Sequence, residues 1–157
     1  TVVCIGGNPI GCEKPGWEFN FGNDVEAANT VLHCGGDIWM IPNNVYGTMH
    51  IGFGEIQRRI APYGEIGRLL YENLISFYET ENASWSAGES WSLGDSPAVG
   101  VTLEPNCGSF MYCKAPEVQE DTSYRYPENS PQIRVYTSIN SRFIIEDFIS
   151  KLQILYG

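Results

Sequence analysis

The stretch Val2-Val3-Cys4-Ile5-Gly6-Gly7-Asn8-Pro9 joins four apolar residues to a run of glycine, asparagine and proline. Such a run is typical of a buried strand that leads into a loop. Residues 24–34 follow as a predicted helix, with Asp24 as its cap and Gly35-Gly36 at its end. Residues 37–42 then predict a second strand. This order predicts an α/β fold with a mostly parallel sheet flanked by helices, and with ligand loops at the carboxyl ends of the strands.

The remaining elements are predicted from spacing and turn residues. Residues 110–118 and 132–137 predict strands, and residues 141–155 predict a terminal helix. Residues 64–80 predict an amphipathic helix, and we expect its apolar stripe to belong to the core: Ile66, Leu69, Leu70, Leu74 and Phe77. Because no linker, repeat or low-complexity tract interrupts the pattern, we expect a single domain over residues 1–157.

The charge of the chain excludes several classes of partner. Lys and Arg number 9 against 19 Asp and Glu, which gives a formal net charge of −10. Clustered basic residues, which attract phosphate, are not visible, so we expect neither nucleic acid nor an anionic membrane as partner. The apolar runs are also far shorter than the ~20 residues of a membrane-spanning helix.

Five cysteines make an odd number and form no Cys-x-x-Cys pair. We interpret them as free thiols, which predicts a cytoplasmic protein.

The first predicted strand follows Thr1 directly, without an initiator methionine. We therefore expect a cut upstream of a buried strand. The expected macromolecular partner is then either a missing N-terminal half or a second copy of the chain in a homo-oligomer that completes the sheet edge.

Glu18 and Asn20 are the first candidates for ligand binding. In an extended segment, side chains two residues apart point the same way, so both can reach one ligand. A carboxylate and an amide together offer the acceptors and donors that vicinal hydroxyls need. The alternative is the start of a helix with a solvated glutamate.

The same segment, Glu18 to Ala28, reads E-F-N-x-x-x-D-x-E-A-A and resembles the signature of the inosine-uridine-preferring nucleoside hydrolases. The resemblance extends to Cys4-Ile5-Gly6-Gly7 at a strand end, to residues 37–45, and to Asp95-Ser96-Pro97-Ala98-Val99 at a helix start. It implies that the chain is the C-terminal portion of a Rossmann-like nucleoside hydrolase fold. The implied full-length activity is hydrolysis of the N-glycosidic bond of ribonucleosides to ribose and free base.

The resemblance also implies roles for single residues. Glu18 would contact the ribose 5′-hydroxyl and Asn20 the 3′-hydroxyl, while Asp95 would bind a Ca²⁺ that holds the 2′- and 3′-hydroxyls. Cys4 belongs to Cys4-Ile5-Gly6-Gly7, where the family has a Met-Gly-Gly type strand end, and Cys12 stands where many members place an asparagine on the 5′-hydroxyl. We therefore assign these two cysteines to the ribose side. Without the resemblance, an aspartate such as Asp95 is usually only a helix cap.

Three residues are candidates for the nucleobase side. Trp85 and Trp91 precede Asp95 and could stack on a base, the alternative being loop anchors packed on the core. Gly94 stands where the family commonly has a histidine or tryptophan that assists the leaving base. Glycine cannot donate a proton.

The family's base and most of its calcium ligands come from an aspartate-rich motif, D-x-D-x-G-x-D-D, that these 157 residues do not contain. We therefore expect no catalytic residue in this chain and no turnover by the chain alone, although the full-length protein would be a Ca²⁺-dependent hydrolase. The alternatives are a non-catalytic protein that binds a sugar or nucleoside, and a purely structural domain.

Overall fold

The computed structural model describes residues 1–84, 86 and 88–157 of the chain. These residues form two compact units. The first unit contains residues 1–48 and 94–140, and the second contains residues 49–93 and 141–157. The expected single domain over residues 1–157 stays a prediction.

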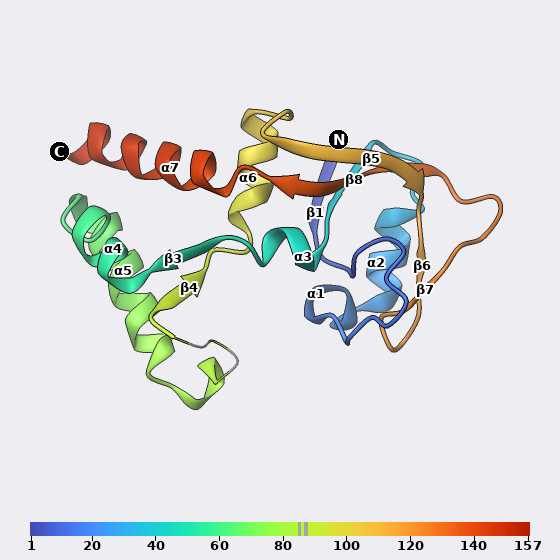
Figure 1. Ribbon diagram of the computed structural model, residues 1–157, viewed down its shortest axis with the longest axis horizontal. Coiled ribbons are helices and arrows are strands. Elements are labelled where there is room, and N and C mark those ends of the chain that lie inside the picture. Colours follow the sequence, from blue (N-terminus) through green and yellow to red (C-terminus); the bar gives the residue numbers. More distant parts are fainter. Residues whose placement is uncertain (85, 87) are drawn as a thin grey trace. The chain divides into compact units, whose positions relative to one another are not determined.

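The first unit is built on a four-stranded sheet with the order β1-β2-β8-β5. Its strands are β1 (Val2–Ile5), β2 (Ile38–Ile41), β5 (Gly108–Lys114) and β8 (Gln132–Ile139). Figure 1 labels three of these strands, β1, β5 and β8. β1, β2 and β8 are parallel, whereas β5 runs antiparallel to β8. The predicted α/β class with a mostly parallel sheet is therefore confirmed.

The predicted strand over residues 110–118 is wrong in its bounds. β5 already begins at Gly108 and ends at Lys114. The chain then turns through the buried Pro116 into the short strand β6 (Glu117–Val118), which pairs with β7 (Tyr124–Arg125). Proline lacks the N–H that a continuing ladder needs, and this explains the break.

Four helices belong to the first unit: α1 (Phe19–Gly22), α2 (Val25–Leu32), α3 (Asn43–Tyr46) and α6 (Ser96–Leu103). The Asp24 carboxylate caps α2 as predicted, accepting a 2.8 Å hydrogen bond from the Ala27 N–H. α2 packs on one face of the sheet through a buried cluster that includes Phe21, Leu32, Ile38, Met40, Ile133 and Val135. These apolar core residues lie on strands and helices. Polar residues follow the carboxyl ends of β1 and β2.

The second unit joins a two-stranded antiparallel sheet to helices. It contains β3 (His50–Gly52), β4 (Ser90–Ser92), α4 (Phe53–Arg59), α5 (Gly64–Tyr78), the 3-10 turn η1 (Glu81–Ala83) and α7 (Ser141–Tyr156). Its core consists of Ile51, Ile56, Ile60, Ile149 and Leu152. None of the helices in the described part of the chain has the length and apolar character needed to span a bilayer.

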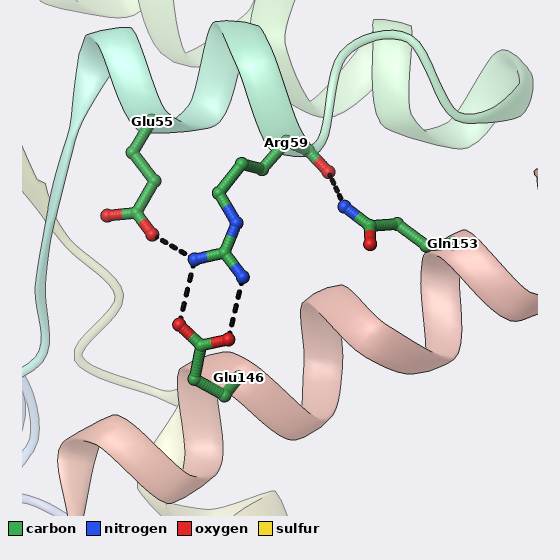
Figure 2. Close-up of polar contacts among 4 residues, drawn as sticks. All are labelled: Glu55, Arg59, Glu146 and Gln153. Carbon is green, nitrogen blue, oxygen red and sulfur yellow. Dashed lines mark hydrogen bonds and ion pairs between the residues drawn. The ribbon is translucent and has the colours of Figure 1, made fainter.

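Arg59 links α4 to α7 inside the second unit (Figure 2). Its guanidinium donates to both carboxylate oxygens of Glu146, at 2.8 and 2.6 Å, and to Glu55 at 2.6 Å. The Gln153 amide donates to the Arg59 carbonyl oxygen at 3.1 Å. A bidentate pair of this kind fixes orientation as well as distance, so α4 and α7 are held in register.

The predicted core stripe of α5 is wrong for most of its members. Ile66 and Leu69 are 48% and 52% exposed, and Leu70 and Phe77 are also exposed, whereas Leu74 packs on the core. The helix turns its other face inward, with Gly67 against the Ile60 carbonyl and Tyr71 on the core cluster. A glycine permits a closer approach than any larger residue, and this approach decides the orientation of the helix.

Gly67 and Gly54 give a matched test of this close packing. A Cβ at Gly67 would lie 2.1 Å from the Ile60 carbonyl oxygen, whereas a Cβ at Gly54 in α4 meets no atom within 4 Å. We expect Gly67→Ala to lower the free energy of unfolding by about 2 kcal/mol through this clash. Gly54→Ala should raise it by about 0.5 kcal/mol through helix propensity. Urea denaturation followed by circular dichroism measures both, and equal effects would contradict the packing of α5.

Candidate functional site

The carboxylate of Glu18 is the centre of the polar groups at the strand ends. Glu18 precedes α1 in an extended conformation and is only 2% exposed. Its Oε2 accepts hydrogen bonds from the Gly7 N–H at 2.7 Å and the Phe21 N–H at 2.9 Å. Its Oε1 accepts from the Asn20 N–H at 3.1 Å and from the Tyr46 hydroxyl at 2.6 Å. Four donors therefore stabilise this buried charge, which would otherwise be costly to bury.

Gly7 brings the end of β1 within reach of this carboxylate. Its φ of +85° lies in the left-handed region, and a Cβ there would lie 2.3 Å from the Tyr124 hydroxyl and 2.5 Å from Met40. Only glycine fits both restrictions. The Gly7 N–H can therefore point at Glu18 because this position has no side chain.

Thr122, at the turn between β6 and β7, holds the loop that carries Glu18. Its hydroxyl accepts from the Glu18 N–H at 2.8 Å and donates to the Gly16 carbonyl at 3.2 Å, and its own carbonyl accepts from Asn8 Nδ2 at 3.1 Å. Thr122 is 1% exposed and has a φ of 62°, which costs a β-branched residue about 1–2 kcal/mol. The hydrogen bonds offset this strain and keep the loop in one conformation.

Tyr46 connects Glu18 electrostatically to Asp95. Burial raises the pKa of Tyr46 above its ordinary value, and the hydrogen bond to Glu18 and the negative charges of Glu18 and Asp95 raise it further. Asp95 is exposed and stands at the N-terminus of α6, where its side chain makes no capping hydrogen bond with the described residues. Its carboxylate is therefore available to a ligand, unlike that of Asp24.

Asn20 differs from Glu18 although the two are adjacent in the motif. Its backbone N–H is bound to Glu18, whereas its side-chain amide makes no hydrogen bond within the described part of the chain. The amide is partly exposed and offers both a donor and an acceptor. Glu18, Asn20 and Asp95 all belong to the first unit, and Asp95 is close enough to Tyr46 to raise its pKa.

The two cysteines assigned to the ribose side have different surroundings. Cys4 packs against the core cluster and its thiol donates to the Trp39 carbonyl at 3.6 Å, while burial raises its pKa to about 11. Cys12 is exposed and lines a hollow of about 240 Å³. The other residues of that hollow are Asn8, Pro9, Gly11, Glu13, Pro15, Ser123, Tyr124 and Tyr126.

The nucleobase-side candidates are distributed over both units. Trp91 lies in β4 of the second unit, packed on that unit's core and edge-to-face with Phe77 at a ring distance of 5.6 Å. Gly94 directly precedes Asp95 in the first unit. Trp85 lies outside the described residues.

A calcium ion needs six to eight oxygen ligands, mostly carboxylates and carbonyls. Within residues 1–84, 86 and 88–157, no three His, Cys, Asp or Glu side chains are grouped so that they could hold a metal. The described residues do not form a complete calcium site by themselves.

A sequence profile of the inosine-uridine preferring nucleoside hydrolases matches residues 1–145. The chain belongs to this family. The profile includes the Glu18-Asn20 segment and Asp95, so the sequence-based recognition of the family is confirmed. A search of curated protein sequences finds no match.

Solved structures of nucleoside hydrolases share the fold. A plant nucleoside hydrolase, the PpNRh1 enzyme, superposes with a TM-score of 0.76 at 15% identity, over 96% of this chain and 51% of the other. A purine-preferring ribonucleoside hydrolase from Gardnerella vaginalis superposes with a TM-score of 0.70 at 17% identity, over 96% and 49%. The chain thus spans about half the length of these structures, and the predicted Rossmann-like nucleoside hydrolase fold is confirmed.

Tyr46 and Thr122 are functional candidates that sequence reasoning missed. Tyr46 lies four residues after the predicted strand end, which is a weak signal for a group facing the strand-end loops. Thr122 lies 104 residues from Glu18, and nothing in its local sequence points to that contact. Neither residue belongs to a motif.

The hydrogen bonding of Glu18 predicts a strict requirement for a carboxylate. We expect Glu18→Gln to lower the free energy of unfolding by about 3 kcal/mol or more, because the new amide would turn its own donors toward buried N–H groups. Glu120→Gln, an exposed position beside Thr122, should leave stability nearly unchanged. Urea denaturation measures the free energy of unfolding of both variants. A small change in this free energy for Glu18→Gln would contradict the arrangement of four donors around Glu18.

The cysteines should differ in reactivity. With its pKa raised to about 11 by burial, Cys4 carries little thiolate at pH 8, whereas Cys12 and Cys34 are exposed. We expect iodoacetamide to label Cys12 and Cys34 before Cys4, as measured by mass spectrometry of digested protein. Early labelling of Cys4 would contradict its placement against the core.

Proposed function

We propose that this chain forms the ribose-holding part of a Ca²⁺-dependent nucleoside N-ribohydrolase. The full-length protein would hydrolyse the N-glycosidic bond of ribonucleosides to ribose and free base. The observation that supports this most is the arrangement at the strand ends. There a buried, oriented Glu18 carboxylate accompanies the available groups of Asn20 and Asp95.

Each of these groups suits a different part of a ribose. The Asn20 amide can donate to and accept from the 3′-hydroxyl. Asp95 can provide one oxygen ligand to a cation, and a bound hard cation fixes a sugar diol and lowers the pKa of a water molecule. Glu18, with Tyr46 in front of it, would face the 5′ side of the sugar.

Cleavage of an N-ribosidic bond passes through an oxocarbenium-like state with positive charge on the sugar. The carboxylates of Glu18 and Asp95 place negative charge near that position, which favours this state. We propose that the base that activates water comes from outside these 157 residues, so the chain alone would not turn over substrate.

Departure of the nucleobase is the weak step in this proposal. Gly94 has no side chain to protonate a leaving base. Substrates whose leaving group departs without a proton should therefore react best.

The test compares p-nitrophenyl β-D-riboside with inosine and uridine, with and without Ca²⁺. The assay uses both this chain and the longest natural reading frame that contains it. We expect the longer protein to cleave the nitrophenyl riboside in a Ca²⁺-dependent manner, and the chain alone to cleave nothing. Asn20→Ala in the longer protein should lower kcat/KM about 100-fold through the lost sugar contact.

Asn23→Ala is the matched control, because Asn23 is exposed and only three residues away. It should stay close to the parent activity. If the longer protein cleaves none of the three substrates, the hydrolase proposal fails.

A second candidate is a non-catalytic protein that binds a sugar or nucleoside. Gly94 and Cys12 favour it, since both replace residues that relatives use, and so does the complete occupation of Glu18 by donors of this chain. Binding of ribosides without cleavage would support this candidate.

We also propose a cytoplasmic location. All five cysteines are free thiols, which supports a reducing compartment.

A further inference from the structure

The acceptor capacity of Glu18 is fully used within the chain. An ionised carboxylate has two oxygens with about four acceptor positions. Oε2 accepts from two backbone N–H groups, and Oε1 accepts from one backbone N–H group and from the Tyr46 hydroxyl. A ligand hydroxyl can therefore bind this carboxylate only if one donor leaves.

The Tyr46 hydroxyl is the one side-chain donor among the four. The other three are the backbone N–H groups of Gly7, Asn20 and Phe21, which are fixed by the end of β1 and the first turn of α1. The backbone of Tyr46 is itself held in α3 by a 3.0 Å hydrogen bond to Pro42 O, next to the buried Val45. Only rotation of the Tyr46 side chain could open a position on Oε1.

The Tyr46 hydroxyl occupies the acceptor position on Oε1 that a ligand hydroxyl would need. Its oxygen is 2.6 Å from Oε1, and charge-assisted O–H···O bonds have lengths of about 2.5–2.7 Å. A sugar hydroxyl bound to Oε1 would put its oxygen at nearly the same point. The two groups therefore exclude one another.

Burial and the nearby negative charges keep this phenol protonated. The pKa of Tyr46 is raised first by burial, then by its hydrogen bond to Glu18 and by the charges of Glu18 and Asp95. At neutral pH the hydroxyl is a donor to Glu18. A ligand that displaced it would leave this donor without its charged partner, which disfavours displacement.

We propose that Tyr46 determines the sugar specificity of this site, with its hydroxyl in the place of the ligand's 5′-hydroxyl, so that 5-deoxyribosides are bound in preference to ribosides. This inference rests on the proposed ribose-binding function. A methyl group at C5 requires no acceptor from Glu18. A 5′-hydroxyl would either displace Tyr46 or stay unpaired, and an unpaired buried hydroxyl discriminates strongly against a ligand.

The experiment measures the binding of methyl β-D-ribofuranoside and its 5-deoxy analogue to the longest natural reading frame that contains this chain, with Ca²⁺ present, by NMR titration. For the wild-type chain we expect the 5-deoxy sugar to bind about tenfold more tightly, as one unsatisfied hydroxyl predicts. Tyr46→Phe frees a position on Oε1 and should shift the preference about tenfold or more toward the ribofuranoside.

Tyr124→Phe is the matched control. The Tyr124→Phe variant also loses a partly buried hydrogen bond, from the Tyr124 hydroxyl to Asn8 O at 3.0 Å, but Tyr124 donates no hydrogen bond to Glu18. It should keep the wild-type preference. The wild-type ratio needs no variant, so the inference stays testable even if Tyr46→Phe unfolds.

Two results would overturn the inference: wild-type protein that binds the ribofuranoside as tightly as the 5-deoxy sugar, or a Tyr46→Phe variant with the wild-type ratio. Failure of the proposed function gives a different result. In that case neither sugar binds to any of the three proteins.

Discussion

The buried Glu18 carboxylate is the interaction on which the strand-end region depends. It collects N–H groups from the end of β1 and from the first turn of α1, and a hydroxyl from the turn after β2. A charge removed from water needs all of these donors. One side chain therefore orders three segments of the chain. All acceptor positions of the Glu18 carboxylate are filled by donors of the chain, whereas the side-chain amide of Asn20 is available to a ligand.

Local sequence patterns predicted the sheet well and the orientation of one helix poorly. The apolar runs at residues 2–5 and 37–42, with the helix between them, sufficed for the parallel pair β1 and β2. In α5 the apolar stripe was the wrong guide. The contact of Gly67 with the Ile60 carbonyl and the inward Tyr71 turned another face toward the core. Periodicity measures amphipathicity, but it does not record where a backbone can approach closely.

The candidate site was predictable as far as its motif extends. Glu18, Asn20 and Asp95 stand in segments with recognisable spacing, and the structure keeps them in one unit. The spacing of two residues in an extended segment suggested that Glu18 and Asn20 can reach one ligand. The structure places Asn20 in α1, so this spacing argument does not apply to the pair, and the Asn20 N–H is one of the donors to Glu18. Tyr46 could not be inferred, because its role depends on a single hydroxyl reaching across 28 positions of sequence.

The hydrogen bonds between Thr122 and the loop that carries Glu18 can form only late during synthesis of the chain. The Glu18 N–H and the Asn8 amide find their partner 104 and 114 residues further along the chain. A ribosome that has translated Glu18 must therefore add another 104 residues before the hydrogen bond to Thr122 can form. Contacts of such long separation form late, after local helices and turns. We therefore expect the loop that carries Glu18 to be among the last parts of the nascent chain to reach its native conformation.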